Sequence, residues 1–157
     1  MGAPPIDVRV SASVDAPLAA AGLARLAGAV LRAEGVRRGA VSIALVGRRR
    51  IRSVNRVHRG RDRETDVIAF ALGTAARGHG GAAGPGTVVG DVYVCVPVAR
   101  AQALRFGTTP RDELRRLVVH GLLHVLGYEH PAGEARVRSP MWRRQERYVA
   151  RFGRLAR

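Results

Sequence analysis

Three of the chain's five histidines fall in one short segment, HGLLHVLGYEH at 120–130. His120 and His124 are four residues apart, so on a helix their Cβ atoms lie about 6 Å apart on one face and both imidazoles can reach one ion. Gly127 can adopt the left-handed conformation that ends a helix and reverses the chain, which would place His130 opposite the other two. The spacing therefore predicts a helix that ends here, followed by a loop that turns back.

This segment is otherwise almost entirely apolar, so its helix is predicted to be buried. Buried imidazoles need polar partners, and one metal ion would serve all three. Neutral imidazole is a good ligand for Zn²⁺, and three protein ligands leave a fourth position for water, which is typical of a catalytic site. We predict one Zn²⁺ on His120, His124 and His130, with Glu129 as fourth ligand if the site is structural. The alternative is three histidines of the core or surface that bind no metal.

The spacing equals that of the metzincin metalloproteases, HExxHxxGxxH, except that position 121 is Gly. In those enzymes the Glu takes a proton from zinc-bound water as general base, and Gly121 can transfer no proton. A zinc ion alone still lowers the pKa of its water to about 7. The pattern argues against peptide hydrolysis and favours phosphodiester hydrolysis. A metallopeptidase that uses another carboxylate as base, such as Glu129, stays open as an alternative.

The charge of the chain predicts a polyanionic partner. The 157 residues carry a formal net charge of +15, and all 27 basic residues are Arg. An excess of this size on a chain with no long basic amphipathic helix favours nucleic acid over a membrane surface. Codon bias is an alternative explanation for Arg in place of Lys, although not for the surplus of base over acid.

Length, cysteine content and apolar runs predict one cytoplasmic domain over 1–157. The single cysteine, Cys95, excludes an intramolecular disulfide and a cysteine-based zinc cluster, and it fits a reducing compartment. No export signal is visible, and the longest apolar stretch, around 18–31, is interrupted by Arg25. We therefore expect no membrane partner.

Apolar periodicity predicts a fold of class α/β (α+β), with a small mixed sheet of about four strands packed against several helices. Strands are predicted over 6–13, 41–47, 66–72 and 87–98, the last two pairing as a hairpin around a glycine-rich surface loop at 73–86. Helices are predicted from 15–17 to about 32, over 48–59, from Thr109 to 126, and from Ser139 onward. The metal site would lie at the end of a central helix. The last helix is predicted to face inward through Trp142, Gln145, Tyr148, Val149 and Phe152.

The helix predicted over 48–59 has Ile51, Val54 and Val57 on its inner side and arginines on its outer face. Arginine suits the negative charge that spreads over a reacting phosphate, because its planar group stays protonated. Arg59, at the junction with the next strand, is the candidate catalytic arginine; a solvated surface role is the alternative. Asp66 and Asp91 are predicted to open strands, where they would orient ligands or anchor turns. The candidate substrate-binding residues are Arg48, Arg52, Arg56 and Arg59.

Four ordered segments carry a resemblance to a known family. They are VNRVHRGRDRETDVIAF, VVGDVYVCVPVARAQA, HGLLHVLGYEH and MWRRQE, within about residues 50–150. Together they resemble the YbeY family, the bacterial single-strand-specific metallo-endoribonucleases of ribosomal RNA maturation. This sequence departs from the family pattern at His58, Ala69, Ala71 and Glu129.

The resemblance implies zinc on His120, His124 and His130, with Arg59 as the functionally important arginine of a basic groove. It also implies action on single-stranded RNA at the 3′ end of 16S rRNA and in ribosome quality control, in contact with the small ribosomal subunit and assembly factors. A ribosome assembly factor in which zinc only holds the fold stays open as an alternative.

Overall fold

Four strands form one mixed sheet in the computed structural model, which describes residues 5–73 and 87–157. Their order across the sheet is β1 (Ile6–Ala12), β2 (Arg38–Val46), β4 (Thr87–Cys95) and β3 (Val67–Ala71). The first three run parallel, and β3 pairs antiparallel with β4. The predicted mixed sheet and the pairing on either side of the glycine-rich stretch are confirmed. Apart from Gly73, the loop predicted at 73–86 lies outside the described residues.

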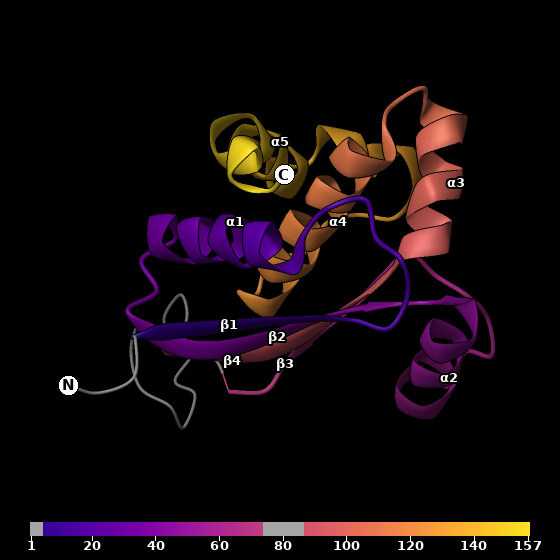
Figure 1. Ribbon diagram of the computed structural model, residues 1–157, viewed down its shortest axis with the longest axis horizontal. Helices are drawn as coiled ribbons and strands as arrows, with labels where there is room; N and C mark the ends of the chain where they lie inside the picture. Colours follow the sequence, from indigo (N-terminus) through magenta and orange to yellow (C-terminus); the bar gives the residue numbers. More distant parts are fainter. Residues whose placement is uncertain (1–4, 74–86) are drawn as a thin grey trace.

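Helices cover both faces of the sheet unequally (Figure 1). One face carries α1 (Ala20–Ala33) and α4 (Pro110–Val125), with α3 (Val96–Phe106) beside α4. Helix α5 (Pro140–Phe152) packs on α1 and α4 from the side away from the sheet, and α2 (Arg48–Arg59) covers the other face. Two short 3₁₀ helices, η2 (Gly133–Arg138) and η3 (Gly153–Leu155), flank α5. The main apolar core lies between the sheet and α1 and α4, and a smaller cluster lies under α2. None of the helices in the described part of the chain combines the length and apolar character needed to cross a membrane.

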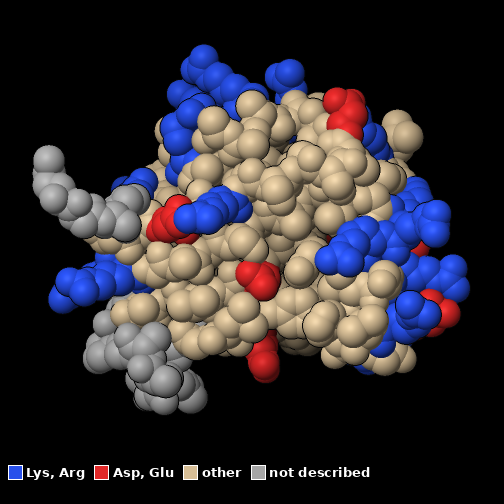
Figure 2. All heavy atoms as spheres, turned by 60° about the horizontal axis from the view of Figure 1, so that its bottom comes forward, with Lys and Arg blue, Asp and Glu red and all other residues tan. Residues whose placement is uncertain are grey.

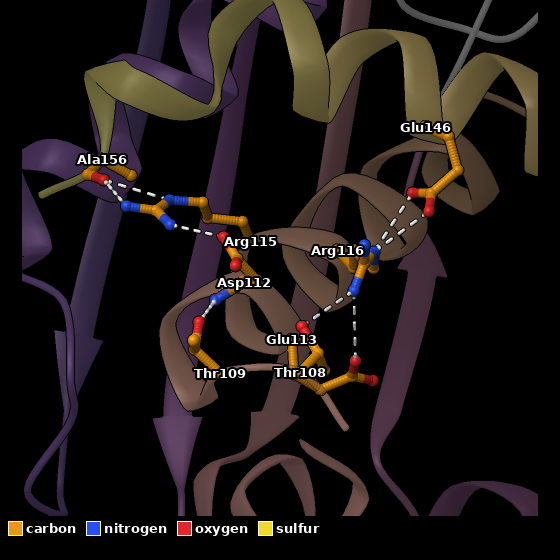
Figure 3. Close-up of polar contacts among 8 residues, drawn as sticks. All are labelled: Thr108, Thr109, Asp112, Glu113, Arg115, Arg116, Glu146 and Ala156. Carbon is orange, nitrogen blue, oxygen red and sulfur yellow. Dashed lines mark hydrogen bonds and ion pairs between the residues drawn. The ribbon is translucent and has the colours of Figure 1, made fainter. Parts of the chain in front are cut away.

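The start of α4 is fixed by its predicted cap (Figure 3). The Thr109 hydroxyl accepts a hydrogen bond from the Asp112 N–H at 3.1 Å, and Pro110 occupies the first turn, where no N–H is needed. One turn later, Arg115 forms an ion pair with Asp112 at 2.8 Å and donates to the Ala156 carbonyl at 2.7 Å. The helix that carries two of the histidines is thereby fixed at its start and tied to the C-terminal segment.

Three predicted boundaries were wrong, among them the start of β2, which lies at Arg38 and not at 41. Helix α1 begins at Ala20, not at 15–17, because the Ala19 N–H donates to the Arg157 carbonyl at 3.1 Å and the chain before it stays non-helical. Strand β4 ends at Cys95, and residues predicted as strand begin α3 instead, a helix that was not predicted. Pro97 cannot donate to a strand ladder but fits the first turn of a helix.

The predicted inner face of α2 was wrong at one position. Ile51 and Val54 are buried, but Val57 is 67% exposed. The buried stripe continues at Asn55 instead, whose Nδ2 donates to the Arg63 carbonyl at 2.9 Å. Residues 51, 54 and 55 share one helical face, whereas 57 lies to its side. The buried position that was predicted for Val57 from its apolar side chain is thus filled by Asn55, whose amide binds the loop that follows α2.

Candidate metal centre

The end of α4 is built to turn the chain back on itself, as predicted. Gly127 has a φ of +95°, which a residue with a side chain rarely adopts. Its N–H donates to the His124 carbonyl, and the Tyr128 N–H donates to the Leu123 carbonyl, both at 3.0 Å. This pair of bonds is the Schellman motif, which satisfies the last carbonyls of a helix. The reversal brings His130 back to the helix face it has just left.

The three histidines converge through their Nε2 atoms. Nε2 of His120 lies 3.0 Å from Nε2 of His124 and 3.3 Å from Nε2 of His130. Among the described residues, these three form the one group of potential metal ligands whose donor atoms all lie within 4.8 Å of one another. The sequence-based prediction that one ion can contact all three imidazoles fits this geometry.

Each imidazole has an oxygen acceptor beside its Nδ1. Nδ1 of His120 lies 2.7 Å from the Gln145 side-chain oxygen. Nδ1 of His124 lies 2.9 Å from the Tyr128 carbonyl, and Nδ1 of His130 lies 2.8 Å from the Pro131 carbonyl. Because a carbonyl oxygen only accepts, Nδ1 carries the proton and Nε2 keeps its lone pair. Three lone pairs then face one point with no proton between them, which is the tautomer and the donor set that a divalent metal requires.

Burial keeps two of these imidazoles neutral. It lowers the pKa of His120 from 6.5 to about 4, against the opposing effect of the hydrogen bond to Gln145. Burial also lowers the pKa of His124, and electrostatic interactions with His130 and Arg59 lower it further. Neutral imidazole is the form that binds a metal ion, so the site is ready to bind one at neutral pH.

Gly121 packs directly on the sheet. A Cβ at this position would lie 2.5 Å from Cγ1 of Val92 on β4 and 3.2 Å from Cγ2 of Val67 on β3. The sequence indicated only that a general base is missing here. The structure adds a packing reason, because no side chain fits between helix and sheet. A carboxylate in the metalloprotease position is therefore excluded on steric grounds as well.

A cavity of about 490 Å³ lies over the histidines, and two arginines from different elements line it. Arg59 comes from the end of α2 and Arg136 from η2, and Asp66 lines the same cavity. Asp66 is held by the Val67 N–H at 2.8 Å and by the Gln102 amide at 3.1 Å. The imidazoles that could bind a metal and two guanidinium groups therefore line one cavity, as a site for an anionic substrate requires.

Glu129 and Asp91 take other places than those considered for them. Glu129 lines the cavity but is exposed, and it is not part of the converging ligand group. Asp91 lies within β4 and not at its start, and its Oδ1 accepts a hydrogen bond from the Ser42 hydroxyl at 2.7 Å. Asp91 therefore has a structural partner on β2 and does not line the histidine cavity.

Of the four arginines predicted on the outer face of α2, Arg59 alone lines the histidine cavity. All four are exposed, and Figure 2 shows basic side chains gathered where α2 lies, with acidic ones among them. Arg48 pairs with Glu64 at 2.7 Å and Arg52 with Asp62 at 2.8 Å. Arg56 and Arg52 line a separate shallow hollow with Asp62. This surface is therefore basic but partly neutralised by the loop that follows α2.

A buried ion pair supports the loop that carries His130. The Tyr128 hydroxyl donates to the Glu34 carboxylate at 3.0 and 3.2 Å, and Arg144 of α5 approaches the same carboxylate at 3.3 Å. The Glu34 side chain is only 8% exposed. The Tyr128 carbonyl accepts a hydrogen bond from Nδ1–H of His124. The contacts of Tyr128 and Arg144 with Glu34 therefore also help to orient a candidate metal ligand.

The comparisons with known proteins now bear on this site. Residues 11–153 match the family Endoribonuclease YbeY. The chain belongs to this family. The YbeY endoribonuclease of Geobacillus thermodenitrificans is 41% identical over 123 residues, which cover 76% of this chain and 78% of the relative. The one from Moorella thermoacetica is 41% identical over 136 residues, which cover 83% and 85%.

A solved structure supports the same fold. The solution structure of TM1509 from Thermotoga maritima matches with a TM-score of 0.59 at 27% identity, over 90% of this chain and 86% of that one. YbeY membership confirms the resemblance seen in the sequence, and with it the prediction of an enzyme that hydrolyses RNA.

Two residues of the site were not predicted from the sequence. Gln145 was expected to face inward but was given no role, although a polar side chain on an apolar helix face signals a buried hydrogen bond. Arg136 was not considered, because it lies in a short 3₁₀ helix outside every YbeY-like segment. Only the folded chain brings it to the histidines.

Proposed function

We propose that this chain is a zinc-dependent endoribonuclease that acts on single-stranded RNA and matures the 3′ end of 16S rRNA. The observation that carries the proposal is the convergence of three Nε2 atoms within a hollow that Arg59 also lines. The net charge of +15 and the similarity to YbeY endoribonucleases support an RNA substrate. The cellular role, the small ribosomal subunit and assembly factors as partners, and the cytoplasmic location follow from the resemblance.

Zinc is the ion that the donor set favours. Among residues 5–73 and 87–157, three imidazoles converge without a thiolate or a carboxylate, and this donor set fits catalytic zinc. His120, His124 and His130 would hold the ion, and Gln145 and two backbone carbonyls would orient the rings. When bound, zinc supplies Lewis acidity, which lowers the pKa of water and polarises a phosphoryl oxygen.

The protein's own groups position the phosphodiester. Arg59 presents a planar, permanently charged group that can donate two parallel hydrogen bonds to phosphate oxygens. Its charge stabilises the negative charge that the phosphate oxygens gain as the reaction proceeds. The Asp66 carboxylate accepts hydrogen bonds from the Thr65 hydroxyl, the Val67 N–H and the Gln102 amide, so it is held in place in the wall of the same hollow. The metallopeptidase alternative would need Glu129 as its base, and Glu129 lines the cavity but is exposed and lies outside the converging ligand group.

The test combines metal analysis with cleavage of labelled RNA, single-stranded and annealed, with and without a chelator. We expect about one zinc per chain, cleavage of the single strand only, and loss of cleavage on chelation. The His120→Ala variant should lose both metal and cleavage. Arg59→Ala should keep its metal and lose about 10²- to 10³-fold in rate, whereas Arg25→Ala, an exposed arginine on α1, should behave as the parent.

The same preparations reveal a contaminating nuclease. Cleavage that is equal in the parent protein and in His120→Ala would overturn the proposal. Peptide cleavage that survives Arg59→Ala would favour the metallopeptidase. If a metal-free His124→Ala protein stays folded and supports ribosome assembly fully in cells, the enzymatic interpretation is wrong.

A further inference from the structure

A second cavity adjoins the metal centre. It has a volume of about 330 Å³ and lies among α3, α4, η2 and α5. Asp66, His120 and Arg136 line both this cavity and the one over the histidines. A ligand that fills the second cavity would therefore touch the same groups as a phosphate held beside the histidines.

Aromatic and apolar side chains form much of its wall. Phe106 at the end of α3 and Trp142 on α5 both line it, with Leu117 and Val137. Phe106 is 59% exposed, although a large apolar side chain gains by being covered. The guanidinium group of Arg105 lies 5.6 Å from the centre of the Phe106 ring, and that of Arg136 lies 5.6 Å from the centre of the Trp142 ring. Phe106 is thus exposed and Trp142 half-buried, and aromatic rings beside arginines are the surfaces on which proteins stack the bases of single-stranded RNA.

The polar part of the wall is rich in acceptors. Glu113 is buried, and its carboxylate approaches Arg116 only to 4.0 Å. Arg116 makes closer contacts, with Glu146 at 3.1 Å and Thr108 at 3.4 Å (Figure 3). Within 5–73 and 87–157, no hydrogen bond reaches the Glu113 carboxylate. Glu113 thus lines the cavity with a carboxylate whose nearest charged partner, Arg116, lies 4.0 Å away, and it can accept a hydrogen bond from a ligand.

This combination selects a base over a phosphate. Three carboxylates, those of Asp66, Glu113 and Glu146, line the cavity together with Arg116 and Arg136, so its wall has no excess of positive charge to attract an anion. The same oxygens can accept hydrogen bonds from the amino group of a base, while the rings stack on its faces. Arg136 lies in the wall shared with the metal-centre cavity, where it can reach the phosphate attached to such a nucleotide.

We propose that this cavity binds one base of the RNA strand, next to the phosphate held at the histidines. The base stacks on Trp142 and Phe106, and its exocyclic amino group donates to Glu113 or Asp66. Adenine, cytosine and guanine carry such a group and uracil does not, so the cavity disfavours uracil. The assignment rests on the proposed function for its position along the RNA, but base binding itself can be measured separately.

The chain's single tryptophan gives a direct measurement, since Trp142 is the only indole in the protein. The probes are AMP, CMP, GMP, UMP and ribose 5-phosphate, titrated into the metal-loaded protein while its tryptophan fluorescence is followed. We expect saturable quenching by the amino-bearing nucleotides, weaker binding of UMP and no quenching by ribose 5-phosphate. Equal responses to all five probes, or none to any nucleotide, would overturn the base pocket.

A pair of variants on α3 tests the same pocket with RNA. Phe106→Ala should weaken binding of a single-stranded oligonucleotide about 5- to 150-fold. Leu104→Ala is the matched control, because Leu104 is 86% exposed on the same helix and does not line the cavity. Glu113→Gln should reduce the preference for amino-bearing bases while leaving stacking in place.

The two proposals fail in different ways. If the protein cleaves RNA but Phe106→Ala binds it as tightly as Leu104→Ala, the base pocket is wrong and the proposed function stands. If nucleotides quench Trp142 but purified protein never cleaves RNA, the pocket stands and the proposed function is wrong.

Discussion

His120 on α4 and Gln145 on α5 are joined by a hydrogen bond of 2.7 Å between Nδ1 and Oε1. The bond fixes the ring so that Nε2 points to the other two histidines, and Gln145 is only 2% exposed, so water cannot replace it. Gln145→Leu should therefore lower zinc affinity about 10- to 100-fold, measured by competition with a chromogenic chelator.

Gln145→Glu is the matched variant for this prediction. The introduced carboxylate still accepts the hydrogen bond from Nδ1–H and makes Nε2 a more basic metal ligand, so zinc affinity should stay close to that of the parent. Circular dichroism would establish that both variants are folded. If Gln145→Leu binds zinc as tightly as the parent, the hydrogen bond has no role in orienting His120.

Gly121→Ala should destabilise the protein by about 1–3 kcal/mol, because its Cβ would overlap Cγ1 of Val92. Gly28→Ala is the control within α1. There the Cβ would meet only the mobile end of the Arg32 side chain at 3.1 Å, and alanine favours a helix by up to about 1 kcal/mol. Urea unfolding of the metal-free proteins measures both free energies of unfolding.

A double variant separates packing from other effects of Gly121→Ala. In Gly121→Ala with Val92→Ala, the removed methyl groups make room for the new Cβ. The double variant should then be more stable than the sum of the single changes predicts, by about 1 kcal/mol or more. Strict additivity would show that the close approach of α4 to β4 does not limit what position 121 accepts.

The features that were predicted correctly from the sequence are set by residues close together along the chain. The spacing of His120 and His124, the turn at Gly127 and the cap at Thr109 each involve residues within one or two helical turns. These local rules were enough to predict the end of α4 and the convergence of the histidines. They also predicted α2 with its bounds.

What the sequence could not predict depends on partners far along the chain. Gln145 gains its role only because α5 packs beside α4, and the charge of Arg52 is partly neutralised by its ion pair with Asp62 in the following loop. The boundary between β4 and α3 was missed because valine and proline at 96–98 suit a buried strand edge and a first helical turn equally well. In each case tertiary packing decided between local alternatives.

The metal-free protein should lose stability as the pH falls from about 6.5 to about 4. Burial lowers the pKa of His120 to about 4, whereas the unfolded chain restores the ordinary value near 6.5. Between these values the unfolded state binds more protons, so the free energy of unfolding decreases with falling pH, by up to about 3 kcal/mol. Urea unfolding in EDTA between pH 7.5 and 4.5 measures the slope.

His120→Gln isolates this contribution, because glutamine has no proton to gain in this range. The slope of stability against pH should be shallower in His120→Gln than in the parent. Identical slopes would mean that His120 is not buried in its neutral form. In the zinc-loaded parent the loss should be steeper, since protons compete with the metal for Nε2.

Asp62→Asn should strengthen the binding of single-stranded RNA. Asp62 holds Arg52 through two hydrogen bonds, at 2.8 and 3.2 Å, and both side chains are more than half exposed. A surface pair of this kind is worth at most about 1 kcal/mol, so a phosphate can compete for the arginine, and removing the acid frees it completely. If the α2 surface contacts the RNA, one further phosphate contact should steepen the dependence of log Kd on log salt by about 0.7.

Asp7→Asn on β1, at the opposite edge of the sheet, removes the same charge and should leave this slope unchanged. Fluorescence anisotropy from 50 to 300 mM salt, about the range in which such contacts weaken, distinguishes the two variants, and equal slopes would show that the arginines of α2 other than Arg59 do not contact the RNA.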